Sequence, residues 1–222
     1  MRSEEKPMLA VSGLTWARRH KREFDAVLTV EDPDIGRWRP ASTGSLRFHR
    51  KPAPAHLVLR FYDLDYPLPP PYHQPWMLLA TPDDVLKAIA FAQQHDHLLV
   101  HCKAGVSRST ALVLAILTER LGDPEAALQS LLVLQPNAVP NRHVTALADK
   151  LLGCHGKLIE TLDIWDKSVA GNETRRLLCR LAHYYEFGVP RTEFVNDNPL
   201  EVARGVDPGS DRSAGRYHRK GA

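Results

Sequence analysis

Short apolar runs alternate with segments that keep an apolar face at helical spacing along most of the chain. Three runs rich in β-branched, leucine and aromatic residues are typical of buried strands. They are 24–30, followed by a turn-like 31–34, then 57–62 and 98–100. Because segments with helix signals lie between and after these runs, the pattern predicts strands and helices in alternation.

The helix signals are specific at several positions. Thr81, Pro82 and two acids in the first turn start a helix whose apolar face continues to about His95. A second helix is expected at 111–121 and ends at Gly122, and a third begins directly afterwards at Asp123 and Pro124. A fourth is expected at 141–152, where Asn141 begins it and Gly153 ends it. This order predicts an α/β fold, a three-layer sandwich with a central, largely parallel sheet flanked by helices. A ligand site is expected where the carboxyl ends of the strands meet helix N-termini.

The C-terminal third differs from the alternating region. Residues 157–185 are expected to form a helical hairpin packed on the main domain, with a partner-binding module as the alternative. Residues 204–222 carry five Lys/Arg against two Asp, a net charge of +3 that equals the formal charge of the whole chain. We therefore expect a main domain over 8–153, a helical extension over 154–190 and a disordered basic tail over 191–222.

Composition narrows the class of protein. Hydrophobic residues make up 43% and charged residues 25% of the 222 positions, as in a globular protein. No apolar run is long enough to span a bilayer, and the first residues lack the apolar core of a secretory signal. Three separated cysteines do not suggest a disulfide framework, so the expected location is cytoplasmic.

The segment 101–110, His-Cys-Lys-Ala-Gly-Val-Ser-Arg-Ser-Thr, is the most informative part of the sequence. A strand leads into it and a helix leads out, so Cys102 and Arg108 lie at the two ends of one tight loop. The loop amides and the helix N-terminus would point into one concavity, which is an anion site. A phosphate there would receive a bidentate guanidinium from Arg108 and a sulfur beneath its phosphorus.

The same loop would make the sulfur reactive. Only the thiolate is a good nucleophile, and a cysteine at a helix N-terminus beside an arginine is favoured in that form. Gly105 lets the backbone approach closely and can take a positive φ. We expect the hydroxyl of Ser109 to ease the departure of the sulfur in a second step, and His101 to orient the loop through hydrogen bonds.

His-Cys-(five residues)-Arg-Ser resembles the signature of the cysteine-dependent protein tyrosine phosphatases. The residues Ala-Gly-Val-Ser-Arg-Ser-Thr at 104–110 are most similar to those of the dual-specificity branch and its small bacterial relatives. The resemblance implies a phosphocysteine enzyme without a metal or other cofactor, with the phosphate held by Lys103, Ala104, Gly105, Val106, Ser107 and Arg108. It also implies a general acid on a loop after another strand. Asp63 best matches that position and Asp65 is the second choice, although either carboxylate could be a turn or capping residue. Asn141, in Pro140-Asn141-Arg142, resembles a motif that supports the loop, and helix capping explains it equally well.

Other functions are compatible with parts of this pattern. Cys102 alone could be a buried, inert thiol or the sulfur carrier of a rhodanese-like domain. Alternatively, the loop could bind phosphorylated partners without hydrolysing them. Phosphotyrosine in proteins is the expected substrate, and a shallow pocket would also admit phosphoserine and phosphothreonine. Lys103 is similar to lysines in phosphoinositide phosphatases, but their usual second lysine is replaced by Val106. Nucleic-acid binding has only the basic tail in its favour.

Overall fold

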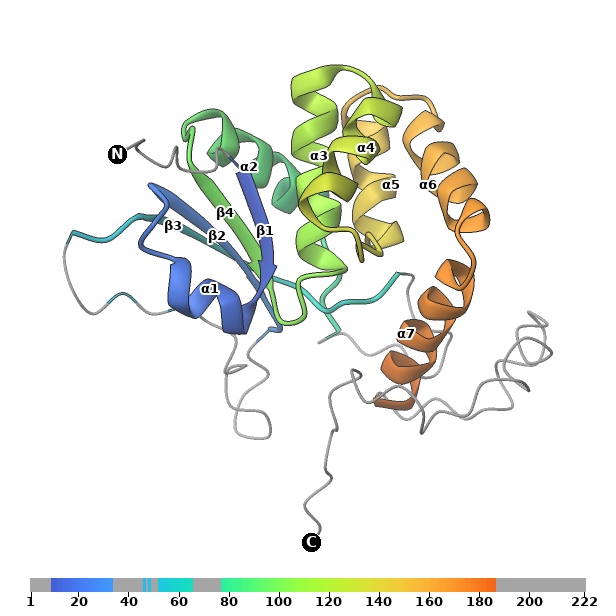
Figure 1. Cartoon of the computed structure of the whole chain (residues 1–222), viewed down its shortest axis with the longest axis horizontal. Coiled ribbons are helices and arrows are strands. Elements are labelled where there is room, and N and C mark those ends of the chain that lie inside the picture. The colour runs from blue at the N-terminus through green and yellow to red at the C-terminus, as the bar shows by residue number, and fades with distance from the viewer. Residues whose placement is uncertain (1–8, 34–45, 47, 49–51, 66–76, 187–222) are drawn as a thin grey trace, which may run out of the picture.

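The computed structural model describes residues 9–33, 46, 48, 52–65 and 77–186 (Figure 1). Its sheet contains β1 (Leu9–Gly13), β2 (Ala26–Glu31), β3 (Ala55–Arg60) and β4 (Leu98–Cys102). The strand order is β1-β4-β2-β3, and every neighbouring pair is parallel. All four strands therefore end at the same edge of the sheet, which confirms the expected α/β class.

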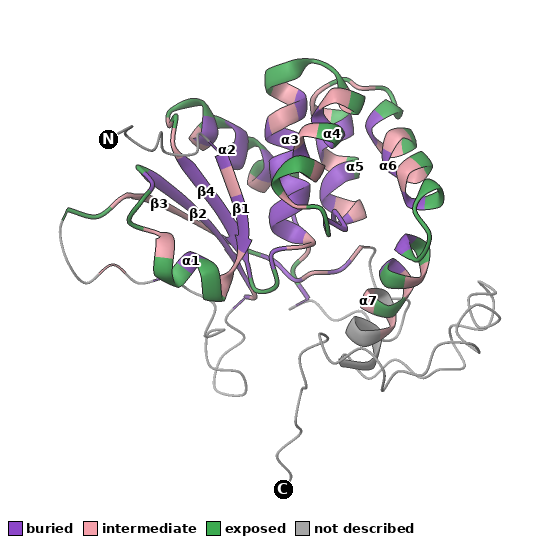
Figure 2. Cartoon of the chain, in the orientation of Figure 1, coloured by how far each residue is buried: buried purple, intermediate pink, exposed green. Residues whose placement is uncertain are grey.

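The two faces of the sheet are covered by different helices. On one face, Leu28 of β2 and Val100 of β4 pack in the main core with residues of α2 (Pro82–Gln93), α3 (Arg108–Leu121), α4 (Pro124–Leu134) and α5 (Arg142–Leu151). On the other face, Val27 and Leu99 pack with Ala17 of α1 (Leu14–His20). The alternation of neighbouring residues between two cores produces the three layers, and both central strands are buried throughout (Figure 2).

Most helix boundaries lie where the sequence places them. Thr81 forms a capping box with Asp84, Asp123 and Asn141 cap α4 and α5, and Gly122 ends α3 with a positive φ of 64°. The helix expected at 111–121 is α3, and it begins three residues earlier, at Arg108. The strand predicted at 57–62 ends at Arg60, because the amide of Tyr62 turns to the carbonyl of Leu78. Neither β1 nor α1 was predicted.

The extension contains α6 (Lys157–Ser168) and α7 (Asn172–Glu186). The expected hairpin is wrong: α7 continues away from α6 instead of returning alongside it (Figure 1). Gly171 has a positive φ of 88° between the two helices, and Arg176 of α7 bonds to the carbonyl of Pro140 before α5. The predicted tail, 191–222, lies outside the described residues. Within the described part of the chain, no helix combines the length and apolar character needed to cross a membrane.

Candidate active site

The candidate site lies at the carboxyl edge of the sheet, where several strands end together. Cys102 is the last residue of β4 and Arg108 is the first residue of α3. Asp32 follows β2 directly, and Asp63 comes three residues after β3. The parallel topology therefore brings the loop 103–107 and two carboxylates together, as expected for this class of sheet.

The carbonyl groups of the loop are bonded to residues outside its concave side. The carbonyl of Lys103 accepts from the amide of Leu14 at 3.1 Å, and that of Gly105 accepts from the side chain of Gln135 at 3.1 Å. The carbonyl of Val106 accepts from the amide of Val139 at 2.6 Å. Because these bonds fix the carbonyls outward, the opposite N–H groups are left to face a common centre, which is the geometry of an anion-binding nest.

Two glycines allow the loop to pack against the end of β1. Gly105 has a φ of 81°, and a Cβ built on it would lie 2.2 Å from the backbone nitrogen of Gly13. A Cβ on Gly13 would lie 2.8 Å from the carbonyl oxygen of Ala104. The predicted close approach and positive φ of Gly105 are confirmed, and Gly13 is a second requirement that the sequence pattern did not indicate.

The sulfur of Cys102 is held inside the loop. It accepts a hydrogen bond from the amide of Gly105 at 3.2 Å and lies 3.2 Å from the hydroxyl of Ser109. Cys102 and Ser109 are both buried. The contacts around Cys102 therefore place a backbone amide and a hydroxyl directly against the sulfur.

Arg108 is anchored by one nitrogen. Its NH1 donates to Asp32 at 2.6 Å and to the carbonyl of Phe61 at 2.8 Å. Its Nε is buried, has no hydrogen-bond partner among the described residues and lies 3.8 Å from Asp63. Burial opposes the charge, but Asp63, Asp32 and Cys102 together raise the pKa of Arg108 above its usual value. The guanidinium is therefore charged, and it keeps a donor that a phosphate could use.

The N-terminus of α3 has no side-chain cap. Ser107 occupies the N-cap position, but its hydroxyl donates to Asp63 at 2.6 Å instead of to the first turn. In α2, α4 and α5 the N-cap side chain accepts from the helix. The partial positive charge of α3 therefore remains directed at the loop beside Arg108, where an anion would be stabilised.

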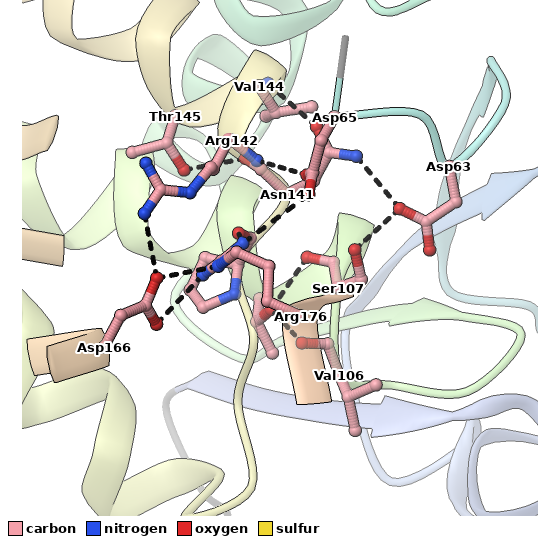
Figure 3. Close-up of polar contacts among 12 residues, drawn as sticks. Asp63, Asp65, Val106, Ser107, Asn141, Arg142, Val144, Thr145, Asp166 and Arg176 are labelled. Carbon is pink, nitrogen blue, oxygen red and sulfur yellow. Dashed lines mark hydrogen bonds and ion pairs between the residues drawn. The ribbon is translucent and has the colours of Figure 1, made fainter. Parts of the chain in front are cut away.

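The two candidate acids differ in what they contact (Figure 3). Asp63 Oδ1 accepts from Ser107 and, at 2.9 Å, from the side chain of Asn141, so this carboxylate faces the loop 103–107. Asp65 accepts from the amide of Arg142 at 2.7 Å and lies 3.7 Å from Arg176, which directs it to the start of α5. Burial raises the pKa of Asp65, against the opposing effect of Arg176. The geometry favours Asp63 over Asp65 for chemistry at the loop.

Asn141 has two functions in the fold. Its side-chain oxygen accepts from the amide of Val144 and caps α5, while its side-chain nitrogen donates to Asp63. The capping interpretation is therefore confirmed, and the same side chain also contacts Asp63.

His101 supports the loop from the α1 side of the sheet. Its Nε2 lies 2.8 Å from the hydroxyl of Thr29, which in turn lies 2.8 Å from Nε2 of His56, and its Nδ1 lies 3.3 Å from the carbonyl oxygen of Cys102. A proton on Nδ1 satisfies that carbonyl, so Thr29 donates to His101 and His56 donates to Thr29. Burial lowers the pKa of His101 to about 4. The ring is therefore neutral near pH 7 and orients the loop through hydrogen bonds.

The structure places the remaining predicted residues around the same concavity. Lys103 and Ala104 are exposed at its rim, and Val106 and Ser107 are half-buried. Besides Gly13, three contributors were missed: Asp32, assigned only to a turn, Gln135, and Arg176 in the helical extension. No short-range pattern marks them, because each reaches the site from a distant segment. Among the described residues, no group of three or more His, Cys, Asp or Glu side chains could hold a metal ion.

Comparisons with known proteins agree with this architecture only at the level of general shape. No protein-family model and no curated protein matches the sequence. Similar solved structures include DUSP15 (17% identity, TM-score 0.47, 72% of this chain and 94% of that chain). They also include the Yvh1 phosphatase domain from Chaetomium thermophilum (18%, 0.45, 71% and 97%). A third is the human tyrosine phosphatase-like serine/threonine/tyrosine-interacting protein (16%, 0.48, 67% and 93%).

The second of these is named as a phosphatase domain and the third as phosphatase-like. At such identities and TM-scores the similarity assigns no activity to this chain. Its chemistry has to follow from its own residues.

Proposed function

We propose that the protein is a phosphatase that hydrolyses phosphate monoesters through a phosphocysteine intermediate. The observation that carries this proposal is the loop 102–109. One concavity combines a buried sulfur that accepts from the amide of Gly105, loop carbonyls that are bonded outward, an uncapped helix N-terminus and the buried Nε of Arg108, which has no hydrogen-bond partner among the described residues. Each feature favours a tetrahedral oxyanion directly above the sulfur.

In the first step, the thiolate of Cys102 attacks phosphorus, so an S–P bond forms as the bond from phosphorus to the leaving oxygen breaks. Arg108 and the loop amides hold the equatorial oxygens, where transition-state charge is spread. Asp63 gives its proton to the leaving oxygen.

In the second step, a water molecule attacks phosphorus and transfers its proton to the Asp63 carboxylate. The S–P bond breaks, and the electron pair returns to the sulfur of Cys102. The hydroxyl of Ser109, 3.2 Å from that sulfur, donates to the thiolate as it leaves. The enzyme then returns to its starting state with inorganic phosphate as the product.

Phosphotyrosine in proteins is the substrate class that we propose, and phosphoserine or phosphothreonine is admitted if the pocket is shallow. A free, reactive thiolate requires a reducing compartment, which is consistent with a cytoplasmic enzyme. The single exposed Lys103 on the loop keeps a phosphoinositide or other non-protein phosphate monoester as the second candidate.

The proposal is tested with an aryl phosphate, phosphopeptides carrying each of the three phosphoamino acids, and phosphoinositides. Cys102→Ser should abolish turnover of every substrate, while Cys154→Ser, which changes a half-buried thiol in another part of the chain, should retain it. No hydrolysis by the wild type, or full activity in Cys102→Ser, refutes the mechanism. Hydrolysis of phosphoinositides alone would support the second substrate class.

The acid is identified in the same assay with Asp63→Asn and Asp65→Asn. A positioned general acid contributes about 10²–10⁴-fold, and we expect a loss in that range for Asp63→Asn with phenyl phosphate. The loss should shrink with a nitrophenyl ester, whose leaving oxygen needs no proton. If only Asp65→Asn shows that dependence on the leaving group, the assignment of Asp63 is wrong.

A further inference from the structure

The C-terminal helix α7 reaches the candidate active site through the side chain of Arg176. NH1 of Arg176 donates to the carbonyl of Pro140 at 2.9 Å and lies 3.7 Å from Asp65 (Figure 3). Arg176 is about nine-tenths buried. A buried guanidinium that donates to a main-chain carbonyl fixes the position of that segment, because the donor cannot be replaced by water.

The guanidinium is itself held in place by α6. Its Nε and NH2 donate to the two carboxylate oxygens of Asp166 at 2.7 and 3.2 Å. Asp166 is buried, and Arg142 at the start of α5 donates to it at 3.0 Å. Because this two-oxygen contact holds Nε and NH2, the third nitrogen, NH1, faces Pro140.

The segment 139–142 that Arg176 holds is bonded to the phosphate loop and to both candidate acids. The amide of Val139 donates to Val106, and that of Asn141 approaches the carbonyl of Ser107 at 3.4 Å. The side chain of Asn141 donates to Asp63, and the amide of Arg142 donates to Asp65. A shift of this segment would therefore move the general acid relative to the sulfur.

We propose that Arg176 is a positioning residue of the active site, so that α6 and α7 belong to the catalytic unit. This inference rests on the proposed function, because it assumes that Asp63 is the acid. Arg176 acts through Pro140 and Asn141 and touches no reacting atom. The environment of Cys179 on α7 supports the placement of this helix: burial raises the pKa of its thiol, as do Asp63 and Asp65.

The test uses the full chain with Arg176→Gln and a matched control, Arg175→Gln. The control removes the same charge from an exposed neighbour on the same helix. We measure kcat and KM with phenyl phosphate and with a nitrophenyl ester. A misplaced acid costs up to about 10²-fold, so Arg176→Gln should lower kcat for phenyl phosphate at least about tenfold. The loss for the nitrophenyl ester should be smaller, KM should change little, and Arg175→Gln should match the wild type.

An equal loss with both esters would mean that Arg176 does not position the acid, and no loss would mean that it has no part in the site. Either result overturns the inference and leaves the phosphatase proposal intact. If Arg176→Gln does not fold, Arg176→Lys keeps the charge without the two-oxygen contact, and the same comparison of esters is decisive.

A wild type without phosphatase activity would refute the proposed function instead. Amide hydrogen exchange then tests the positioning. Faster exchange at Val139, Asn141 and Arg142 in Arg176→Gln or Arg176→Lys, but not in Arg175→Gln, would support it, and unchanged exchange would overturn it.

Discussion

Acidification should destabilise this protein through the neutral, buried His101. The ring has no exposed surface, and its nitrogens lie against Thr29 and the carbonyl of Cys102. Burial is the largest cause that lowers its pKa to about 4 from the usual 6.5 of a histidine. His56 and Lys21 lower the pKa further, while the hydrogen bond to Cys102 opposes the change.

The sign of the effect follows from the two pKa values. Between pH 6.5 and 4 the unfolded chain binds a proton at this position and the folded protein does not, so the free energy of unfolding falls as the pH falls. With those values the loss between pH 7 and pH 5 is about 2 kcal/mol, and it reaches a limit of about 3 kcal/mol below pH 4. Such a loss is a substantial part of the stability of a typical domain.

The measurement is urea unfolding of the wild type and of His101→Gln at pH 7, 6 and 5. Between pH 7 and pH 5 the wild type should lose about 2 kcal/mol more than the variant, whatever the stability of the variant at pH 7. His95→Gln, outside the core, controls for the loss of a histidine as such. Equal losses in the wild type and in His101→Gln would refute a neutral His101 in the folded protein.

Three further changes test the construction of the loop. Gly13→Ala should lower both stability and phosphate binding, because its Cβ would lie 2.8 Å from the carbonyl oxygen of Ala104; thermal unfolding with and without inorganic phosphate measures both. Asp32→Asn should weaken phosphate binding severalfold, because the hydrogen bond from Arg108 to Asp32 holds the guanidinium in place. Titration calorimetry with phosphate measures the change, and an unchanged affinity would mean that this hydrogen bond is unimportant. Ser109→Ala should retain a rapid first burst of product but slow later turnover, and a loss of the burst itself would contradict its place in the second step.

The chemistry of the loop was predictable because it is local. Cys102 and Arg108 are separated by one tight turn between a strand and a helix, so the short sequence 101–110 contains the sulfur, the donors and the glycine that the loop needs. Helix starts were equally local, since Thr81, Asp123 and Asn141 cap their own first turns. These features depend on backbone geometry within a few residues, and a single sequence displays them directly.

The choice between Asp63 and Asp65 was not local. The sequence placed both carboxylates after one strand, and only the positions of Ser107 and Asn141, 44 and 78 residues from Asp63, separate their surroundings. The helical hairpin expected at 157–185 failed for a similar reason. Its apolar spacing predicted helices correctly, but the direction of α7 follows from contacts of Arg176 with Asp166 and Pro140.

Read alone, the amino-acid sequence determined the loop, its cysteine, its arginine and the α/β class, because each arises from neighbouring residues and from the alternation of apolar runs. Tertiary structure decided which distant groups complete the site: Asp32 for Arg108, 76 residues away, Gly13 against Gly105, and Arg176 behind Asn141. The physical reason is the strand order, which inserts β4 between β1 and β2 and gathers their carboxyl ends at one edge. Apolar periodicity specifies that strands are buried, but it does not specify their neighbours.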